Sequence, residues 1–148
     1  MKDPKCIWVW VGVAVVVVAV ALIWKPTVEK PLVASVPTPV YASQGQLVPQ
    51  FPKGLIIDSK AAISGSYSIN YSSSTNQYAA EYYSSSTVTS LYNQYQTYLP
   101  RNSWTVIGSI TTRPSYDVIW ASQGNDQLQV IIGTQKKGSQ VTVTYTEK

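Results

Sequence analysis

Side chains that could carry out catalysis are few in this sequence and widely spaced. The chain of 148 residues contains no histidine and a single cysteine, Cys6. Without histidine, the usual general base near neutral pH, the Ser-His and Cys-His nucleophile pairs and the commonest transition-metal ligand are all missing. The sequence therefore predicts no catalytic, cofactor-binding or metal-binding residues, and we expect a protein that is not an enzyme.

The carboxylates that follow residue 50 stand far apart along the chain. They are Asp58, Glu81, Asp117, Asp126 and Glu147. Glu81 and Asp117 fall within predicted strands, and a carboxylate pair of the glycosidase type would form if those strands were neighbours. Carboxylates that only keep the surface soluble are the simpler interpretation. Asn125 and Asp126 share a predicted turn, but two residues supply too few oxygens for calcium, which takes about six to eight.

Charged residues are scarce throughout the sequence. They make up 12% of the chain, with a net charge of +4 and a pI near 9.1. From Phe51 onward, seven Lys or Arg residues stand against five Asp or Glu residues. Nothing in that distribution resembles a phosphate-binding stripe, so we expect no nucleic-acid partner. The eighteen Ser and eleven Tyr residues favour an exported domain with a polar, weakly charged surface.

Hydrophobic periodicity predicts the elements that must position any site. Apolar residues alternate over 67–71 and again over 78–82, which predicts a β-hairpin. Between residues 88 and 99 they recur at helical spacing, with Ser85 or Ser86 as the N-cap and Pro100 as the stop. Four more alternating runs follow, separated by turn signals at 113–115, 123–126 and 136–139. The order β-β-α-β-β-β-β predicts an α+β domain of two layers, a mainly antiparallel sheet with one helix.

The same strands contain a second apolar set, which is the candidate interface. We take Val106, Val118 and Val130 to face the helix, so that their neighbours face the other way. Together with one tyrosine of the hairpin, these neighbours form an exposed apolar band of Ile107, Ile119, Ile131 and Tyr83. Contiguous apolar surface commonly marks an interface, which predicts a protein partner or a second copy of this chain. The alternative is that the segment with Leu55, Ile56, Ile57 and Ile63 folds over the band and makes it ordinary core.

The composition of the domain also suits a second kind of ligand. Tyr and Trp rings present stacking faces with a polar handle, and Asn and Gln amides offer hydrogen bonds. A glycan or cell-wall polymer is therefore the alternative ligand. A structural subunit of a larger membrane complex is the third interpretation.

One run near the N-terminus predicts a transmembrane helix. From Ile7 to Trp24, eighteen consecutive residues carry no charge, and at about 1.5 Å per residue they span roughly 27 Å of the ~30 Å hydrocarbon core. Aromatic rings suit both headgroup regions and a lysine closes each end; these residues are Trp8, Trp10, Trp24, Lys5 and Lys25. A cleaved signal peptide is the alternative, but its apolar region is shorter and small residues follow it. We expect an uncleaved anchor that contacts membrane lipid.

The charges that flank the anchor are nearly balanced, and the short N-terminal tail favours an orientation with the N-terminus inside. We expect a single-pass protein of the plasma membrane with its C-terminal domain outside. The predicted parts are a cytoplasmic tail (1–6), a transmembrane helix (7–24), a Pro-rich stalk (25–52) and an extracytoplasmic domain (53–148). Because Cys6 precedes the anchor, the outer domain has no disulfide and its core must hold by packing alone.

Three local features resemble a group of small bacterial envelope domains that are tethered by a helix or a lipid. They are the opening Phe51-Pro52-Lys53-Gly54, a helix that ends at Tyr98-Leu99 just before Asn102-Ser103-Trp104, and a last strand that ends near Thr144-Tyr145. The resemblance covers residues 51–148. It implies a two-layer fold and a location outside the cytoplasm, and it implies no reaction, since such domains are mostly uncharacterised.

Overall fold

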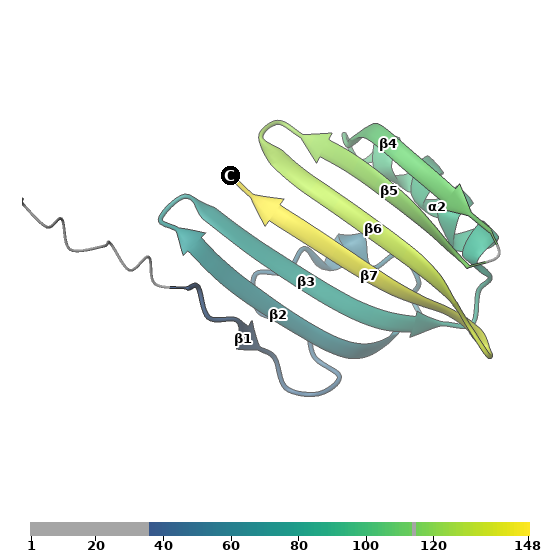
Figure 1. The fold of residues 1–148 in the computed structure, drawn as a ribbon, viewed down its shortest axis with the longest axis horizontal. Helices are drawn as coiled ribbons and strands as arrows, with labels where there is room; N and C mark the ends of the chain where they lie inside the picture. Colours follow the sequence, from purple (N-terminus) through teal and green to yellow (C-terminus); the bar gives the residue numbers. More distant parts are fainter. Residues whose placement is uncertain (1–35, 114) are drawn as a thin grey trace, which may run out of the picture. The chain divides into compact units, whose positions relative to one another are not determined.

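A seven-stranded antiparallel sheet and one long helix make up the part of the chain that the structure describes (Figure 1). The structure is a computed structural model and describes residues 36–113 and 115–148. In chain order the elements are β1 (Val40–Tyr41), the 3-10 helix η1 (Lys53–Leu55), β2 (Ala62–Ser72), β3 (Thr75–Ser84), α2 (Val88–Arg101), β4 (Thr105–Thr112), β5 (Tyr116–Gln123), β6 (Asp126–Gln135) and β7 (Gly138–Glu147). The predicted α+β class, with a mostly antiparallel sheet and one α-helix, is confirmed.

The strands lie in the order β1-β2-β3-β7-β6-β5-β4, and every neighbouring pair is antiparallel. β7 comes last in the sequence but lies in the middle of the sheet, between β3 and β6. β1 and β4 form the two edges. Two hairpin-built halves, β1–β3 and β4–β6, are therefore joined through one central strand.

One face of the sheet carries the hydrophobic core. Figure 1 shows α2 behind β4 and β5, and α2 also contacts β6; part of the segment from residue 42 to residue 61 runs behind the other half of the sheet. Leu91, Tyr95 and Leu99 lie one helical turn apart on α2 and are completely buried. They pack in one cluster with strand residues such as Val130 and Val143, and each large side chain removed from water in this way contributes about 1.5–3 kcal/mol.

The domain begins earlier than its predicted start at residue 53. Val40 and Tyr41 pair with β2, and Val48 and Phe51 are each 3% exposed within the core. Residues 36–52 are therefore part of the domain, and the predicted stalk was wrong for this stretch. Pro39 suits its place beside β1, because an edge strand tolerates a fixed extended φ and a missing donor. The rest of the stalk and the predicted transmembrane helix lie outside the described residues; within those, no helix is both long and apolar enough to span a membrane.

The helix ends differ slightly from the prediction. The N-cap is Thr87, whose hydroxyl accepts a hydrogen bond from the Ser90 N–H at 3.2 Å, and not Ser85 or Ser86. The helix also continues through Pro100 to Arg101. A proline in the last turn removes only one donor, so the helix ends at Arg101, two residues beyond the predicted end at Leu99.

A chain of buried hydroxyls fastens η1 to the sheet. The Tyr95 hydroxyl donates to the carbonyl oxygen of Leu55 at 2.8 Å and lies 3.0 Å from the Tyr82 hydroxyl. Because Tyr95 uses its only proton on Leu55, Tyr82 must donate to Tyr95. Burial raises the pKa of Tyr82 to about 12 and that of Tyr95 well above its ordinary value.

Candidate functional site

The face of the sheet opposite α2 is named here the open face, and the strand register fixes which residues lie on it. Trp120 pairs with Gln129, Gln129 with Thr144, and Thr144 with Ala79. Directly paired residues in antiparallel strands point to the same side. These four residues therefore form one row across β5, β6, β7 and β3, and the row continues through Tyr67 of β2 to Tyr41 of β1.

A pocket of about 330 Å³ lies on this open face. Six of its lining residues have side chains that the register places on that face: Gln77, Trp120, Gln127, Gln129, Thr144 and Thr146. We call this set the Trp120 groove. It combines one large aromatic ring with side-chain amides and hydroxyls and contains no charged residue.

Local backbone features position the Trp120 ring. β4 has a register shift between Val106 and Gly108, and Gly108 is paired with Trp120. A Cβ atom at residue 108 would stand 3.7 Å from Cε3 of Trp120, so the ring lies against the backbone of this glycine. The indole is half-buried, because one of its sides is supported by the neighbouring strand.

Several polar side chains of the Trp120 groove are not engaged. Gln77 accepts a hydrogen bond from the Tyr71 hydroxyl at 2.8 Å. Among the described residues, the side-chain amides of Gln127 and Gln129 and the hydroxyls of Thr144 and Thr146 make no hydrogen bond to another residue. Each of these groups can both donate and accept, so the groove presents hydrogen-bonding groups of both kinds to solvent.

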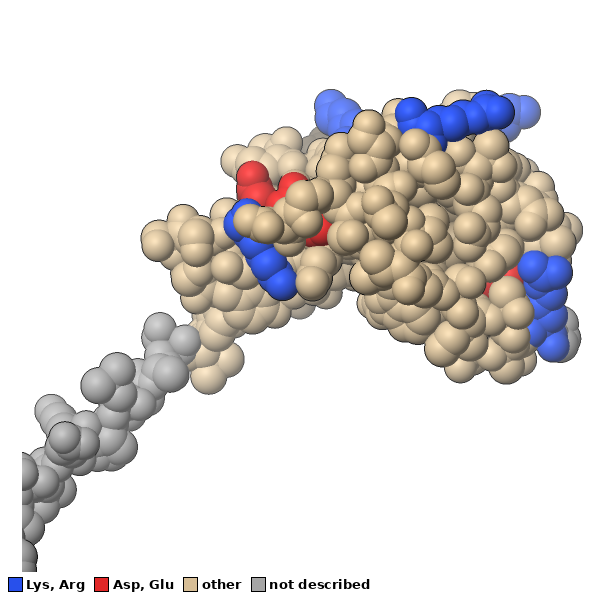
Figure 2. Space-filling model, turned by 90° about the horizontal axis from the view of Figure 1, so that it is seen from above, with Lys and Arg blue, Asp and Glu red and all other residues tan. Residues whose placement is uncertain are grey.

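The open face has almost no charge. Of the acidic residues in the described strands, Glu81 lies on this face, where it accepts a hydrogen bond from the Gln140 amide. Asp117, Asp126 and Glu147 lie on the helix face. Figure 2 shows the same character from another side, with charged side chains confined to a few places and broad uncharged surface between them.

The predicted interface band does not assemble as expected, because Ile119 is a core residue. Ile119 is 0% exposed and pairs with Val130 on the helix face, whereas Val118 pairs with Ile131 on the open face. The prediction that Val118 faces the helix was therefore wrong, and so was the placement of Ile119 on the open face. The two alternating sets of side chains on β5 both contain apolar residues. The set that contains Ile119 also contains Asp117, so from the sequence it was the less plausible core face.

The other three members of the band lie apart. Ile107 is 63% exposed on the edge strand β4, Tyr83 is 47% exposed on β3, and Ile131 is half-buried on β6. β3 and β4 are separated by three strands, or about 19 Å at ~4.8 Å per strand spacing. The segment proposed as a cover packs elsewhere, since Leu55 is buried in the core and Ile56, Ile57 and Ile63 pack against that core.

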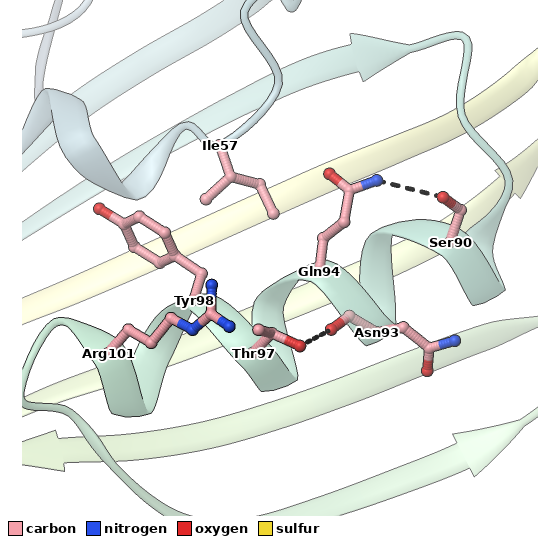
Figure 3. A pocket seen from close by; sticks show the side chains of 7 residues that line it. All are labelled: Ile57, Ser90, Asn93, Gln94, Thr97, Tyr98 and Arg101. Carbon is pink, nitrogen blue, oxygen red and sulfur yellow. Dashed lines mark hydrogen bonds between the residues drawn. The ribbon is translucent and has the colours of Figure 1, made fainter.

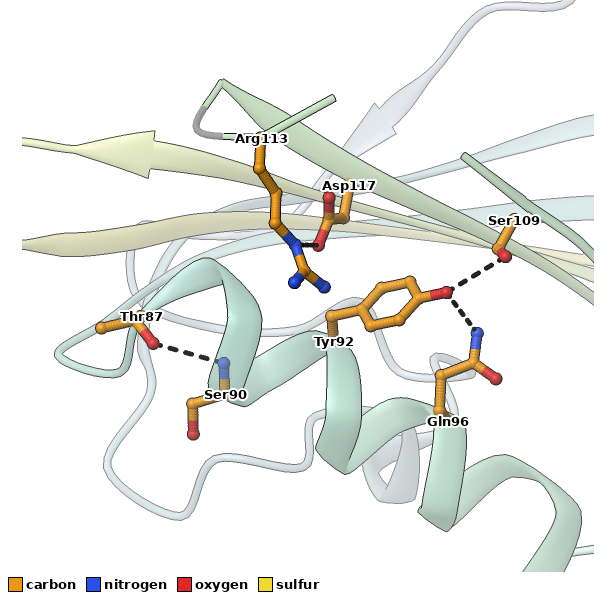
Figure 4. Close-up of polar contacts among 7 residues, drawn as sticks. All are labelled: Thr87, Ser90, Tyr92, Gln96, Ser109, Arg113 and Asp117. Carbon is orange, nitrogen blue, oxygen red and sulfur yellow. Dashed lines mark hydrogen bonds and ion pairs between the residues drawn. The ribbon is translucent and has the colours of Figure 1, made fainter. Parts of the chain in front are cut away.

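Asp117 belongs to a polar cluster at the edge of α2 (Figure 4). Arg113 Nε donates to Asp117 Oδ2 at 3.3 Å, and the guanidinium lies 5.5 Å from the centre of the Tyr92 ring. The Tyr92 hydroxyl donates to Ser109 Oγ at 3.1 Å. This cluster holds α2 to β4 and β5. Because Glu81 lies on the opposite face of the sheet, the carboxylate pair considered from the sequence does not form.

A second cleft, of about 560 Å³, runs along the outer side of α2 (Figure 3). Its polar groups partly satisfy one another within the helix, since Gln94 donates to Ser90 Oγ at 3.1 Å and Thr97 donates to the carbonyl oxygen of Asn93 at 3.0 Å. Arg101 lies at one end and Ile57 faces the helix from the other wall. The Trp120 groove is the stronger candidate for a neutral ligand, because it joins an indole ring to two unengaged amides without a charged group, whereas the cleft along α2 contains Arg101.

The sequence contained one signal for the Trp120 groove. In β6 and β7 the residues Gln127, Gln129, Thr144 and Thr146 alternate with apolar ones, as expected for a half-exposed sheet. What could not be read was that Trp120 shares their face. No protein-family model matches this sequence, and no curated protein or solved structure matches it either. A functional argument must therefore rest on the geometry of the site.

Proposed function

We propose that this protein is a membrane-tethered binding module, without catalytic activity, that recognises an uncharged glycan on the open face of its sheet. The observation that carries this proposal is the Trp120 groove, where an indole lies beside the unengaged amides of Gln127 and Gln129. Sugars present apolar C–H faces that suit aromatic rings, and hydroxyls that both donate and accept hydrogen bonds.

Charge favours a neutral ligand over an acidic or basic one. Glu81 is the charged group among the described strand residues of this face, and the Gln140 amide already bonds it. An anionic polymer would find no cation in the Trp120 groove, and a basic peptide would find no free carboxylate there. The free-energy cost of removing a neutral polymer from water is small if its hydroxyls form hydrogen bonds with the Gln and Thr side chains.

The row through Trp120 suits an extended polymer. It runs from Trp120 through Gln129 and Thr144 to Tyr67, crossing from β5 to β2. Four strand spacings of ~4.8 Å make this about 19 Å. Between the two aromatic ends, Gln129 and Thr144 are half-buried and offer hydrogen-bonding groups, whereas Ala79 is only 2% exposed.

The tether is the second part of the proposal. Residues 7–24 would anchor the chain in the plasma membrane with the N-terminus inside, and Trp8, Trp10 and Trp24 would lie at the headgroups. Eleven residues, 25–35, separate this run from the described domain. Fully extended, they reach no further than about 35–40 Å, so the groove would bind material close to the lipid surface.

Glycan binding can be tested with the full-length chain in detergent micelles. The probes are neutral gluco-, manno- and galacto-oligosaccharides, with uronic-acid oligosaccharides for comparison. We expect binding of a neutral series, weakened about tenfold by Trp120→Ala, which corresponds to ~1.4 kcal/mol. Trp120→Phe should restore part of the affinity because a stacking face returns.

Tyr83→Ala is the matched control, since Tyr83 is also an exposed aromatic residue of the open face but lies outside the groove. It should leave the affinity unchanged. Failure of every neutral oligosaccharide to bind the wild-type chain would remove the proposal, and so would equal losses from the Trp120 and Tyr83 variants.

A protein partner is the second candidate, and exposed apolar residues at the β4 edge favour it. Ile107 and Ile110 are 63% and 50% exposed on that strand. The third candidate, a structural subunit of a membrane complex, predicts co-purification of other chains in mild detergent.

A further inference from the structure

β4 is an edge strand with little of the usual protection against pairing. It pairs with β5 on one side, and no other strand of the described residues pairs with its outer side. Its eight residues, Thr105–Thr112, include no charged residue and no proline. The side chains from Ser109 to Thr112 are all exposed. Such a strand offers a row of unpaired N–H and C=O groups to another strand.

The two edges of the sheet differ sharply in this respect. β1 has only two residues and directly follows Pro39, which has no N–H to donate. Short length and proline are devices that blunt a sheet edge. β4 carries only the irregularity between Val106 and Gly108, so its second half, Ser109–Thr112, is left regular and open.

An apolar row on the open face ends at this edge. Ile131, Val118 and Ile110 are paired in sequence from β6 to β4. Val118 is only 7% exposed although it lies on the open face, because its neighbours cover it, whereas Ile110 at the end of the row is 50% exposed. One more strand beside β4 would bury Ile110 as its neighbours bury Val118.

We propose that the β4 strand of a second copy of this chain pairs antiparallel with β4, joining two seven-stranded sheets into one. A two-fold axis brings the same patch of both copies together, so the patch must be complementary to itself. An uncharged strand meets this condition, since no like charges face each other. In a pairing centred on Ile110, Ile110 of one copy lies opposite Ile110 of the other on the open face, and Ser109 of each copy lies opposite Thr111 of its partner.

The nearest cations do not oppose this pairing. Arg113 follows the C-terminal end of β4, so the two copies of Arg113 lie at opposite ends of the paired strands. At ~3.4 Å per residue they are about 20 Å apart, beyond the ~8 Å screening length of physiological salt. The guanidinium is moreover engaged with Asp117 in its own copy.

The contrast between the edges also fixes the size of the assembly. A growing filament would require β4 of one copy to pair with β1 of the next, and β1 offers two residues. Pairing of β4 with β4 leaves only the β1 edges at the ends, so the assembly closes as a dimer. The Trp120 groove lies on the open face over β3, β5, β6 and β7, and a dimer would present two such grooves on one continuous surface.

Cysteine cross-linking of the full-length chain in liposomes tests the pairing. In a Cys6→Ser background, Ser109→Cys places a thiol near the proposed axis, and Tyr41→Cys places one at the opposite edge. We expect a short bismaleimide to give a covalent dimer from the Ser109 variant at least tenfold more readily than from the Tyr41 variant. Equal yields from both edges, or no dimer from Ser109→Cys, would overturn the proposal.

A charge at the edge provides the second test. Ile110→Lys, added to the Ser109→Cys chain, should abolish the cross-link because two like charges would be placed in the pairing zone. Tyr41→Lys in the same chain is the matched control and should leave the yield unchanged. Circular dichroism of both variants checks that they fold. Oligosaccharide binding by the Ile110→Lys variant should persist, and a loss of that binding would bear only on the glycan proposal and not on β4 pairing. An undiminished cross-link with Ile110→Lys would contradict β4 pairing.

Discussion

Asp117 is a fully buried carboxylate whose Oδ2 accepts a hydrogen bond from Arg113 Nε at 3.3 Å. Its Oδ1 has no partner among the described residues. A buried charge without a partner is strongly unfavourable. The side chain of Arg113 is 45% exposed, so its guanidinium loses little hydration on contacting Asp117. The pair therefore allows Ile119, and with it the Asp117 side of β5, to face the core.

We expect Arg113→Met to lower the free energy of unfolding by about 2–3 kcal/mol, because it leaves the Asp117 carboxylate buried and unpaired. Asp117→Asn removes the charge and should cost only about 1 kcal/mol. The double variant should then be no less stable than Asp117→Asn alone. Urea unfolding of the four chains measures this coupling, and losses that simply add would show that the two side chains do not act together.

The Tyr82 hydroxyl makes stability depend on alkaline pH. Its pKa is about 12 in the folded domain because of burial, against about 10 in the unfolded chain. Since the folded pKa is raised, this stabilisation is complete below pH ~10 and is lost as the pH rises toward ~12. The free energy of unfolding should fall by about 1.4 kcal/mol per pH unit in that window from this group, with a further loss in the same direction from Tyr95.

Tyr82→Phe should reduce the loss of stability at alkaline pH. Near pH 7 the variant should be about 1 kcal/mol less stable, because it lacks the hydrogen bond to Tyr95. Thermal unfolding between about pH 8 and about pH 12 compares the slopes. Tyr41→Phe is the control, because that residue is exposed at the sheet edge. An unchanged slope in Tyr82→Phe would assign the alkaline loss to other groups.

At the level of elements, the turn between β6 and β7 depends on glycine. Gly138 has φ of +98°, and a Cβ atom there would overlap the carbonyl oxygen of Ser84 and lie 2.9 Å from Cα of Ser85. The same corner is tied by Ser139 Oγ, which donates to the carbonyl oxygen of Ser86 at 2.8 Å. Gly138→Ala must therefore displace the end of β3 as well as strain the turn.

We expect Gly138→Ala to destabilise the domain by more than about 3 kcal/mol. Gly124→Ala is a matched control, because Gly124 has φ of +61° in another hairpin and nothing lies within 4 Å of a Cβ atom there. It should cost only about 1 kcal/mol of backbone strain. Denaturant unfolding of both variants distinguishes steric overlap at residue 138 from backbone strain alone. Equal losses of stability would contradict the proposed overlap.

The same corner explains which features of the elements could be predicted. Helical spacing from residue 88 and the run of alternating strands are local, and the sequence indicated both. The choice of Thr87 as N-cap was not local, because the backbone of Ser86 is held by Ser84 and Ser139. The orientation of β5 depended on Arg113 reaching Asp117, and the burial of Val48 and Phe51 depended on a sheet that forms far along the chain.

At the scale of the whole molecule, strand order was beyond local patterns, and the open-face site depended on it. Trp120 and Tyr67 belong to one row only because β6, β7 and β3 lie between their strands. Sequence alternation identified Gln129 and Thr144 as surface residues but not as neighbours. The chemistry of the groove was therefore visible in the residue types, whereas its location required the pairing of β7 with both halves of the sheet.

The central position of β7 makes that strand the joint of the molecule. It pairs along its length with β3 on one side and β6 on the other, and it supplies the completely buried Val141 and Val143. Ending the chain after Lys137 should separate the two halves and expose the core between them. We expect loss of cooperative unfolding and rapid proteolysis, whereas deletion of residues 36–41, which removes only the edge strand β1, should preserve a cooperative transition.

A peptide of residues 138–148 added to the truncated chain provides the decisive comparison. If β7 acts by pairing with both halves, the peptide should restore protease resistance by strand addition, since main-chain hydrogen bonds and alternate side chains give such complementation its affinity. The same peptide with Val141 and Val143 both changed to Asp should fail, because carboxylates would enter the core. A truncated chain that resists protease without any peptide would mean that the two halves fold independently, and that the row from Trp120 to Tyr67 is not held rigid by β7.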